Sequence, residues 1–365
     1  MKVAIITDQH FGARKSSRVF HDFFNKFYTN VFFPTLKERK IDTVFDLGDT
    51  YDNRRTLDLW AANWSKTEYF DKLRDMGITV HSLVGNHTAY FKDTNDVNTL
   101  DGIVGEYNNI HIYDKATEVE IGGLPILFIP WINQQNKDET YSLIARSACK
   151  VAMGHLELNG FEAHRGYIMD HGDSTAPYRH FDKVFSGHFH RKSTRGNISY
   201  LGNPYQIYWN DYRDRRGFHI FDTETLELEY IQNPYEIYEK IYYREDEIQS
   251  GMFKYHEYAQ KFIKIIVEKK TDTDKFERFI SQLDAAGVHE IKVIEDPSFE
   301  QDLNEEIDIE KEDTLTILER YVDDMEHSDK DALKTILKAL YVEALELVCC
   351  IYLQLQEKKR KVPTL

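Results

Sequence analysis

The chain has 365 residues, 41% hydrophobic and 30% charged, a composition typical of a globular protein that excludes a largely disordered one. No window holds the roughly 18 unbroken apolar residues of a membrane helix, so we expect no membrane association. The apolar start reaches Asp8 after a few residues, so we also expect no signal peptide. Three cysteines, Cys149, Cys349 and Cys350, are too few for a disulfide framework and predict a reducing, cytoplasmic location.

The charge is distributed unevenly along the sequence. The formal net charge of −16 at pH 7 disfavours a nucleic-acid partner, because phosphate binding depends on Lys and Arg. Residues 1–235 carry 27 Lys and Arg against 31 Asp and Glu, a net charge of −4, whereas residues 236–365 carry 19 against 31, a net charge of −12. This shift predicts a domain boundary near residue 235.

Apolar runs and helical patterns alternate in the first hundred residues. Strand patterns at 2–7, 43–47 and 79–84 are separated by helical patterns at 16–40 and 57–76, which predicts an α/β core. Beyond residue 105, strands are predicted in closer succession. Their ranges are 110–113, 118–121, 126–130, 150–153, 183–186, 198–201, 217–221 and 226–231.

The remaining chain is predicted to form three further parts. Residues 236–300 form a small unit with strands at 262–268 and 290–294 and a helix at 273–286. Residues 301–313, with seven acidic residues and one Lys, form a solvated linker. Residues 314–365 form two helices, and the second carries an apolar stripe that packs either on its own chain or on a partner protein. We favour the partner; the stripe includes Leu333, Leu337, Leu340, Leu347 and Ile351.

Five short motifs share one design, in which residues able to bind a metal follow an apolar strand at once. They are Asp8-Gln9-His10, Gly48-Asp49-Thr50-Tyr51-Asp52, Gly85-Asn86-His87, Gly154-His155 and Gly187-His188-Phe189-His190. Open α/β folds place ligand sites at such strand ends. Imidazole nitrogens with carboxylate and amide oxygens suit manganese, iron or zinc. A single Gly-His pair is more often structural, but all five motifs in this order predict a metal site.

The same motifs predict a two-metal centre that hydrolyses a phosphoester. A carboxylate that bridges two ions builds a centre ~3.5–4 Å across, which activates water and stabilises in-line attack on phosphorus. Asp49 is the predicted bridge, because it follows a buried strand and a glycine. His87 follows Asn86 directly, so its side chain is predicted to point away from the metals. It would then protonate the leaving alkoxide or contact the phosphate.

These motifs resemble the calcineurin-like metallophosphoesterase superfamily, whose pattern is D-x-H, G-D-x-x-D, G-N-H, G-H and G-H-x-H. Within it, residues 1–235 resemble the SbcD-type nuclease subunits of the meiotic-recombination-eleven family, through GHLELNGF at 154–161, YLGNP at 200–204 and RGF at 216–218. The resemblance implies an α/β/β/α sandwich with a small α+β capping domain and C-terminal helices. It also implies a hydrolase that cleaves DNA, as an exonuclease on duplex ends and an endonuclease on single strands, in end processing, recombination and repair.

The resemblance further implies the cofactors and the partners. Two divalent ions are expected, manganese or alternatively magnesium. One would be held by Asp8, His10, Asp49 and His190, and the other by Asp49, Asn86, His155 and His188. Members of this family work as dimers bound to a coiled-coil ABC-type ATPase, which grips the C-terminal helices of the nuclease.

One position departs from the family pattern. The third motif usually continues Gly-Asn-His-Asp, and Thr88 stands in place of the last residue. A carboxylate beside the catalytic His87 would orient it and raise its basicity, and Thr88 supplies no such charge. We therefore consider Asp52 a candidate catalytic partner of His87, a hypothesis that unchanged single-turnover cleavage by Asp52→Ala would contradict.

Basic residues follow three of the metal loops, where a DNA backbone has to pass. An ordinary solvated surface explains them equally well; they are Arg14, Lys15, Arg54, Arg55, Arg191 and Lys192. Two divalent ions would bring residues 1–235, with their net charge of −4, to about neutral. We therefore expect modest intrinsic affinity for DNA, strong dependence on metal, and reliance on a partner that holds the DNA.

Two other functions stay open. Another two-metal phosphoesterase, acting on a phosphoprotein or a small molecule, would use the same ligands. However, protein phosphatases usually continue G-D-x-x-D-R-G and G-N-H-E, and Asn53 and Thr88 break both patterns. A non-catalytic scaffold with this fold would have lost metal ligands, and all of the expected ligands are present.

Overall fold

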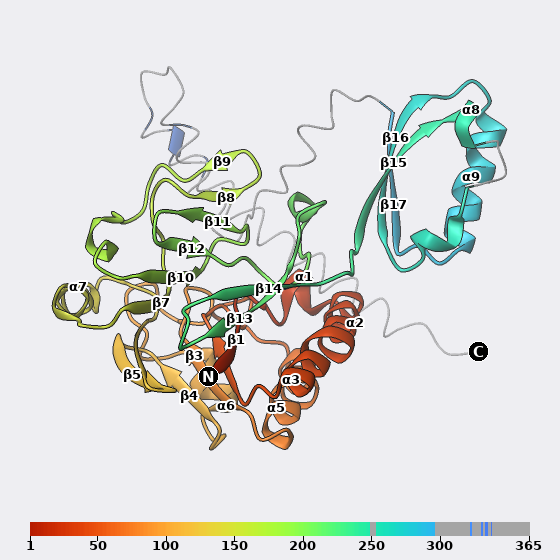
Figure 1. The fold of residues 1–365 in the computed structure, drawn as a ribbon. Coiled ribbons are helices and arrows are strands. Elements are labelled where there is room, and N and C mark those ends of the chain that lie inside the picture. Colours follow the sequence, from red (N-terminus) through yellow and green to blue (C-terminus); the bar gives the residue numbers. More distant parts are fainter. Residues whose placement is uncertain (249–252, 296–321, 323–329, 331–332, 335–336, 338–365) are drawn as a thin grey trace, which may run out of the picture. The chain divides into compact units, whose positions relative to one another are not determined.

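The computed structural model describes residues 1–248 and 253–295 and the single positions 322, 330, 333, 334 and 337. Within residues 1–235, two six-stranded sheets stack with helices outside them (Figure 1). The first sheet has the order β14-β13-β1-β2-β3-β4, and β1 to β4 run parallel. Its strands are β1 (Lys2–Ile6), β2 (Thr43–Asp46), β3 (Thr79–Leu83), β4 (Ile110–Tyr113), β13 (Gly217–Asp222) and β14 (Leu228–Gln232).

The second sheet has the order β11-β12-β10-β7-β6-β5. Its central strands β12, β10, β7 and β6 pair in parallel, and the edge strands β11 and β5 are antiparallel to their neighbours. The strands are β5 (Thr117–Ile121), β6 (Leu124–Ile129), β7 (Val151–His155), β10 (Lys183–Gly187), β11 (Ser193–Arg195) and β12 (Ile198–Tyr200).

One apolar layer joins the inner faces of the two sheets. Ile5 and Phe45 of the first sheet belong to the same buried cluster as Phe128, Met153 and Phe185 of the second. The rings of Phe45 and Phe128 meet edge-on, with centroids 5.2 Å apart. Face-to-face packing of two apolar sheet faces produces the two inner layers of the predicted sandwich. The α/β/β/α fold class is therefore confirmed.

Helices cover both outer faces. On the first sheet lie α2 (Arg18–Phe27), α3 (Phe33–Arg39), α4 (Leu59–Ser65) and α5 (Asp71–Asp75). Turns of π-helix join α2 to α3 and α4 to α5, so the predicted helices at 16–40 and 57–76 are confirmed with local irregularity. On the second sheet α7 (Lys137–Arg146) packs through Ile144. The short elements are α1 (Ala13–Ser16), α6 (Thr99–Val104), β8 (Glu162–His164) and β9 (Tyr167–Ile168).

A separate parallel sheet follows residue 235. Its strands are β15 (Tyr238–Arg244), β16 (Phe262–Lys269) and β17 (Glu290–Ile294), with α8 (Glu245–Ile248) and α9 (Thr273–Ala285). Phe276, Phe279 and Leu283 of α9 pack on this sheet, as the amphipathic pattern at 273–286 predicts. The domain limits stay predictions.

The predicted acidic linker at 301–313 lies outside the described residues. So do Leu340, Leu347 and Ile351 of the predicted stripe, whereas Leu333 and Leu337 are helical and half-buried. Among the described residues, no helix combines the length and the apolarity needed to cross a membrane.

Candidate metal centre

The five motifs lie together at one edge of the two sheets. Asp8, Asp49 and Asn86 follow β1, β2 and β3, which pair in parallel in the first sheet. His155 ends β7 and His188 follows β10, which pair in parallel in the second sheet. Parallel neighbours end at the same edge, so the loops of both sheets meet there. All of these side chains are buried.

The first cluster joins Asp8, His10 and His190, whose ligand atoms lie within 4.8 Å of one another. The Nε2 atoms of His10 and His190 are only 2.9 Å apart, and their rings meet edge-on. The Asp8 carboxylate is held in place by the backbone N–H of His188, at 3.0 and 3.1 Å from its two oxygens. Two imidazole nitrogens aimed at one point beside a carboxylate form a donor set that suits a divalent cation.

The second cluster joins Asp49, His155 and His188, with ligand atoms again within 4.8 Å. His155 Nε2 lies 3.1 Å from Asp49 Oδ2 and 2.9 Å from Asn86 Oδ1, and His188 Nδ1 lies 2.9 Å from the same Asn86 oxygen. His155 Nδ1 is 2.8 Å from the Leu47 carbonyl, which only accepts. The ring proton is therefore on Nδ1, and Nε2 presents its lone pair to the site. The two clusters fit two divalent metal ions.

Glycines make the close approach of the loops possible. A Cβ at Gly85 would lie 2.2 Å from Asp49 Oδ1, and a Cβ at Gly187 would lie 2.0 Å from Thr7 Oγ1 and 2.9 Å from Asp8 Oδ2. Such distances are far below van der Waals contact, so neither position accepts a side chain without moving a predicted ligand. Glycine at positions 85 and 187 is thus explained by the lack of space around the two carboxylates.

The backbone at the site is strained. Asp8, His10, Asp49 and His188 have positive φ angles of 53°, 49°, 51° and 88°. The left-handed region costs an L-residue about 1–2 kcal/mol. Four such residues among seven predicted ligands mean that the surrounding packing holds the ligands in place, as is typical of functional sites.

Charge coupling dominates the titration of the centre. Burial alone would lower the pKa of His10, but the hydrogen bond and the charge of Asp52, with the charges of Asp49 and Asp8, raise it to about 9. Burial alone would raise the pKa of Asp49, but the neighbouring histidines, His155 first, hold it well below its usual range. The metal-free centre therefore keeps a proton on His10 at neutral pH, in a place where a cation would fit.

Mn²⁺ binding should release protons and become tighter as pH rises. A metal ligand must be neutral imidazole, so near pH 7.5 roughly one proton has to leave His10, whose pKa is about 9. We expect the apparent affinity to rise by up to about tenfold per pH unit below pH 9 and to level off above it. Calorimetric titration in buffers of different ionisation enthalpy measures the proton release.

The control for this titration is His111→Asn, at an exposed histidine on β4, which should leave the proton release unchanged. Equal heats in all buffers would contradict the prediction. In the metal-free protein, the contribution of His10 to the free energy of unfolding falls with pH, whereas the metal affinity rises. The charged His10 stabilises the fold fully below pH 6.5, and this contribution is lost as pH rises through 9.

Comparison with known proteins identifies the family. No protein-family model matches the chain. Exonuclease subunit 1 of Enterobacteria phage T4 is 33% identical over 314 residues, which cover 84% of this chain and 89% of the phage protein. The chain belongs to the meiotic-recombination-eleven nuclease family. This assignment rests on the phage relative.

Two solved structures are also similar to part of this chain. A novel archaeal phosphodiesterase is 16% identical, with a TM-score of 0.32, and the match covers 64% of this chain and 100% of that chain. A dimetal phosphatase from Danio rerio is 10% identical, with a TM-score of 0.38, and the match covers 65% and 97%.

Thr88, which follows the predicted catalytic residue His87, has a structural role. Thr88 is fully buried, and its hydroxyl accepts from the Gly85 N–H at 2.8 Å and donates to the Gly85 carbonyl at 3.0 Å. It therefore closes the turn that carries Asn86 and His87. Position 88 therefore holds the loop together through Gly85.

Asp52 contacts His87 in a way that differs from the sequence hypothesis. His87 Nδ1 lies 2.6 Å from the Asp52 backbone carbonyl, whereas the Asp52 carboxylate lies 3.1 Å from His10 Nδ1. A carbonyl only accepts, so the proton is on His87 Nδ1 and Nε2 is the nitrogen left for chemistry. The carboxylate orients His10, and the backbone of the same residue orients His87.

The six basic residues that the sequence placed beside the metal loops differ in exposure and in their contacts. Lys15 and Arg55 are exposed, and Arg14 and Arg54 are half-buried. Arg14 lies over the rings of Phe20 and Tyr208, and Arg191 and Lys192 also have partners within the chain. Arg191 Nε lies 3.3 Å from Glu162 Oε2, and Lys192 Nζ lies 3.0 Å from the centroid of the Tyr230 ring, where burial lowers its pKa to about 8.

A network behind the first metal loop was not predicted. Gln9 stands between the ligands Asp8 and His10, and its amide donates to Asp46 at 3.0 Å while its oxygen accepts from Tyr28 at 2.5 Å. Tyr205 donates to the Gln9 carbonyl at 2.7 Å. The backbone of Asp8 and His10 is left-handed, so the simple alternation of side chains along an extended segment does not indicate this inward-pointing residue.

Proposed function

We propose that the chain is the catalytic subunit of a metal-dependent DNA nuclease, an exonuclease on duplex ends and an endonuclease on single strands, that acts in the cytoplasm in DNA end processing, recombination and repair. The observation that carries the proposal is the pair of adjoining Asp and His clusters at the sheet edge. Membership in a family with a relative named exonuclease subunit 1 supports DNA as the substrate.

Two divalent ions, manganese with magnesium as the alternative, would occupy the two clusters. The first would be held by Asp8, His10, Asp49 and His190, and the second by Asp49, Asn86, His155 and His188. When bound, such ions lower the pKa of water and neutralise charge on the phosphate. The chain contributes rigid ligand loops, since strained backbone and glycine contacts hold the carboxylates in place.

His87 is suited to act as the general acid. The Asp52 carbonyl holds its Nδ1 proton, so Nε2 can carry a second proton to the leaving alkoxide. The backbone N–H of His87 also donates to Asp49 Oδ1 at 2.8 Å. This bond connects the His87 loop to the proposed bridging carboxylate. The ring stands edge-on to His10 with centroids 4.9 Å apart, next to the first cluster.

The DNA backbone would pass the rim formed by the loops after the first two motifs. Lys15 and Arg55 are exposed there. Arg14 lies 5.8 Å above the Tyr208 ring, which stacks with the His190 ring at 6.4 Å. We propose these residues and Arg54 as phosphate contacts. Arg191 and Lys192, the other two predicted contacts, lie beside Glu162 and the Tyr230 ring.

We further propose the predicted roles of the four parts of the chain, the ATPase partner and the homodimer. Residues 1–235 would form the nuclease domain, 236–300 the capping domain, 301–313 a linker, and 314–365 the segment that binds a coiled-coil ABC-type ATPase. The nuclease would act as a homodimer. Leu333 and Leu337, the two stripe positions that the structure describes, are helical.

The test is cleavage of a linear duplex by the purified chain with Mn²⁺, alone and with its ATPase. We expect Mn²⁺-dependent cleavage that His87→Ala lowers by about 10²–10⁴-fold, as for removal of a general acid. A chain lacking residues 314–365 should lose co-purification with the ATPase. No cleavage in the complex, or full cleavage by His87→Ala, would contradict the proposal. Hydrolysis of a phosphopeptide but not DNA would favour a phosphoprotein phosphatase, and absence of bound metal would favour a scaffold.

A further inference from the structure

Trp131 is a large aromatic residue beside the metal centre that the proposed chemistry does not use. It follows β6, at the same sheet edge as the ligand loops. The centroid of its ring lies 5.2 Å from that of His188 and 6.2 Å from that of His155. Its side chain is only partly buried, and it does not belong to the hydrophobic clusters formed by the described residues. Core packing therefore does not account for its position.

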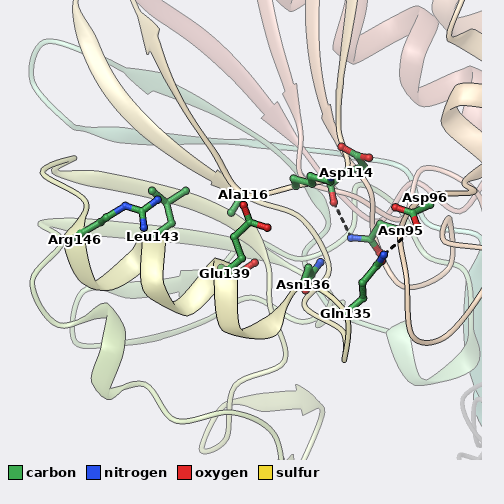
Figure 2. A pocket seen from close by; sticks show the side chains of 11 residues that line it. Asn95, Asp96, Asp114, Ala116, Gln135, Asn136, Glu139, Leu143 and Arg146 are labelled. Atoms are coloured by element: carbon green, nitrogen blue, oxygen red, sulfur yellow. Dashed lines mark hydrogen bonds between the residues drawn. The ribbon is translucent and has the colours of Figure 1, made fainter.

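The backbone of Trp131 is fixed on both sides. Its N–H donates to the Val84 carbonyl at 2.8 Å, one residue before the glycine of the third metal motif. Its carbonyl accepts from Asn95 Nδ2 at 2.9 Å and from Asn136 Nδ2 at 3.0 Å. Asn95 donates a second bond, at 3.0 Å, to the Asp114 carbonyl (Figure 2). Three hydrogen bonds thus fix the backbone from which the partly exposed indole extends beside the metal ligands, as a preorganised binding surface requires.

Trp131 lines a cavity of about 210 Å³. Trp131 links it to the second cluster, because the same residue lines the cavity and places its ring next to His188 and His155. Two further lining residues, Leu156 and Glu157, follow the ligand His155 in the sequence. Its polar groups are the Glu157 carboxylate and an ion pair in which Lys137 Nζ lies 2.9 Å from Asp173 Oδ1. The cavity has room for one planar heterocycle, with an aromatic wall and with carboxylates that accept N–H groups.

We infer that Trp131 and this cavity form the subsite for a nucleobase adjoining the phosphate that is cleaved. The inference rests on the proposed function. Each phosphate in DNA is one sugar away from a base, so a base has to lie next to the metal clusters when a phosphate lies on them. An indole face stacks on any base, which gives affinity without sequence preference.

The subsite also defines the kind of end that the nuclease prefers. A base cannot occupy the cavity and stay paired, so the nucleotide at the metals has to be unpaired and unstacked from its strand. Unpairing and unstacking cost less free energy for terminal nucleotides that fray or are mismatched. We therefore expect faster cleavage at an end with one mismatched pair than at a fully paired end.

The test compares Trp131→Ala and Trp131→Phe with Tyr242→Ala, which removes an exposed aromatic residue of β15. In single-turnover cleavage with Mn²⁺, Trp131→Ala should be about tenfold slower on an intact strand, the loss of one stacked base. On a strand with an abasic nucleotide at the cleaved position, wild type and Trp131→Ala should be equally slow. Trp131→Phe should keep most of the rate, and Tyr242→Ala all of it.

Fluorescence gives a second readout that does not depend on cleavage. A strand with 2-aminopurine at that position should be quenched by wild type with Ca²⁺ in place of Mn²⁺, and not by Trp131→Ala. An abasic penalty that is the same in wild type and Trp131→Ala, or equal quenching by both, would overturn the inference while the nuclease activity stands. Failure of wild type to cleave any DNA would instead contradict the proposed function.

Discussion

Gly85→Ala should lower DNA cleavage by about 10²-fold or more, although the change adds only one methyl group. The new Cβ would lie 2.2 Å from Asp49 Oδ1 and 2.5 Å from the Asp49 backbone nitrogen. A side chain could turn away, but the backbone atom cannot, so either the second or the third metal loop has to shift. A shift of about 1 Å at a catalytic group costs on the order of 10²-fold in rate.

The same shift should weaken metal binding. Asp49 is the proposed bridge between the ions, and its Oδ1 also accepts from the His87 N–H at 2.8 Å. We expect calorimetry of Gly85→Ala with Mn²⁺ to show fewer than two tight sites, and the free energy of unfolding to fall by about 1–3 kcal/mol through overpacking. Single-turnover cleavage and Mn²⁺ titration on one preparation measure both effects.

Gly102→Ala is the matched control. Gly102 lies in α6 and has an ordinary helical backbone, and a Cβ at this position would meet no heavy atom of the described residues within 4 Å. Alanine there should leave cleavage unchanged and stabilise the helix by roughly 0.5–1 kcal/mol. If Gly85→Ala cleaved DNA at the wild-type rate, the close contact between the second and third metal loops would not be needed for catalysis.

The ligand loops could be predicted from the sequence because they depend on local order. An apolar run marks a buried strand, and the polar residues that follow it, such as Asp49 after β2, lie at the sheet edge in any parallel arrangement. The same reasoning placed β16, α9 and β17. It did not find α7, because only Thr140 and Ile144 of its ten residues are buried and the apolar periodicity is weak.

The residues that support the ligands could not be predicted because their roles depend on tertiary contacts. Trp131 is held by Val84 and Asn95, which are distant in sequence. The contact between Asp52 and His87 uses a backbone carbonyl, which no residue type encodes. One sequence does not reveal tertiary contacts, so these positions cannot be distinguished in it from ordinary surface or core residues.

Arg216 is the clearest example of such a supporting residue. The sequence places it in a basic cluster, yet its side chain is only 5% exposed. Its Nη1 donates to the carbonyl of the ligand His190 and to Asn203 Oδ1, and its Nη2 donates to Asp211 Oδ1 at 2.6 Å. Asp211 in turn accepts from the backbone N–H of Tyr208 at 3.0 Å. The guanidinium thus supports the His190 loop from two directions.

Arg216→Met should therefore lower the free energy of unfolding by about 3–5 kcal/mol, because removal of one partner leaves the Asp211 carboxylate buried without its counter-charge. Methionine keeps most of the volume, so the loss reports the charge and the hydrogen bonds. Chemical denaturation followed by tryptophan fluorescence measures it. Arg215→Met, at the exposed neighbour, should change stability by no more than about 0.5 kcal/mol.

Loss of the Arg216 contacts should also reach the metal centre. His190 would lose the donor on its carbonyl, and outer contacts of this kind typically contribute about 10–100-fold to metal affinity. We expect Mn²⁺ to bind more weakly to the cluster of Asp8, His10 and His190, with the cluster of Asp49, His155 and His188 less affected. Equal weakening of both sites, or none, would mean that Arg216 supports the fold alone and does not position His190.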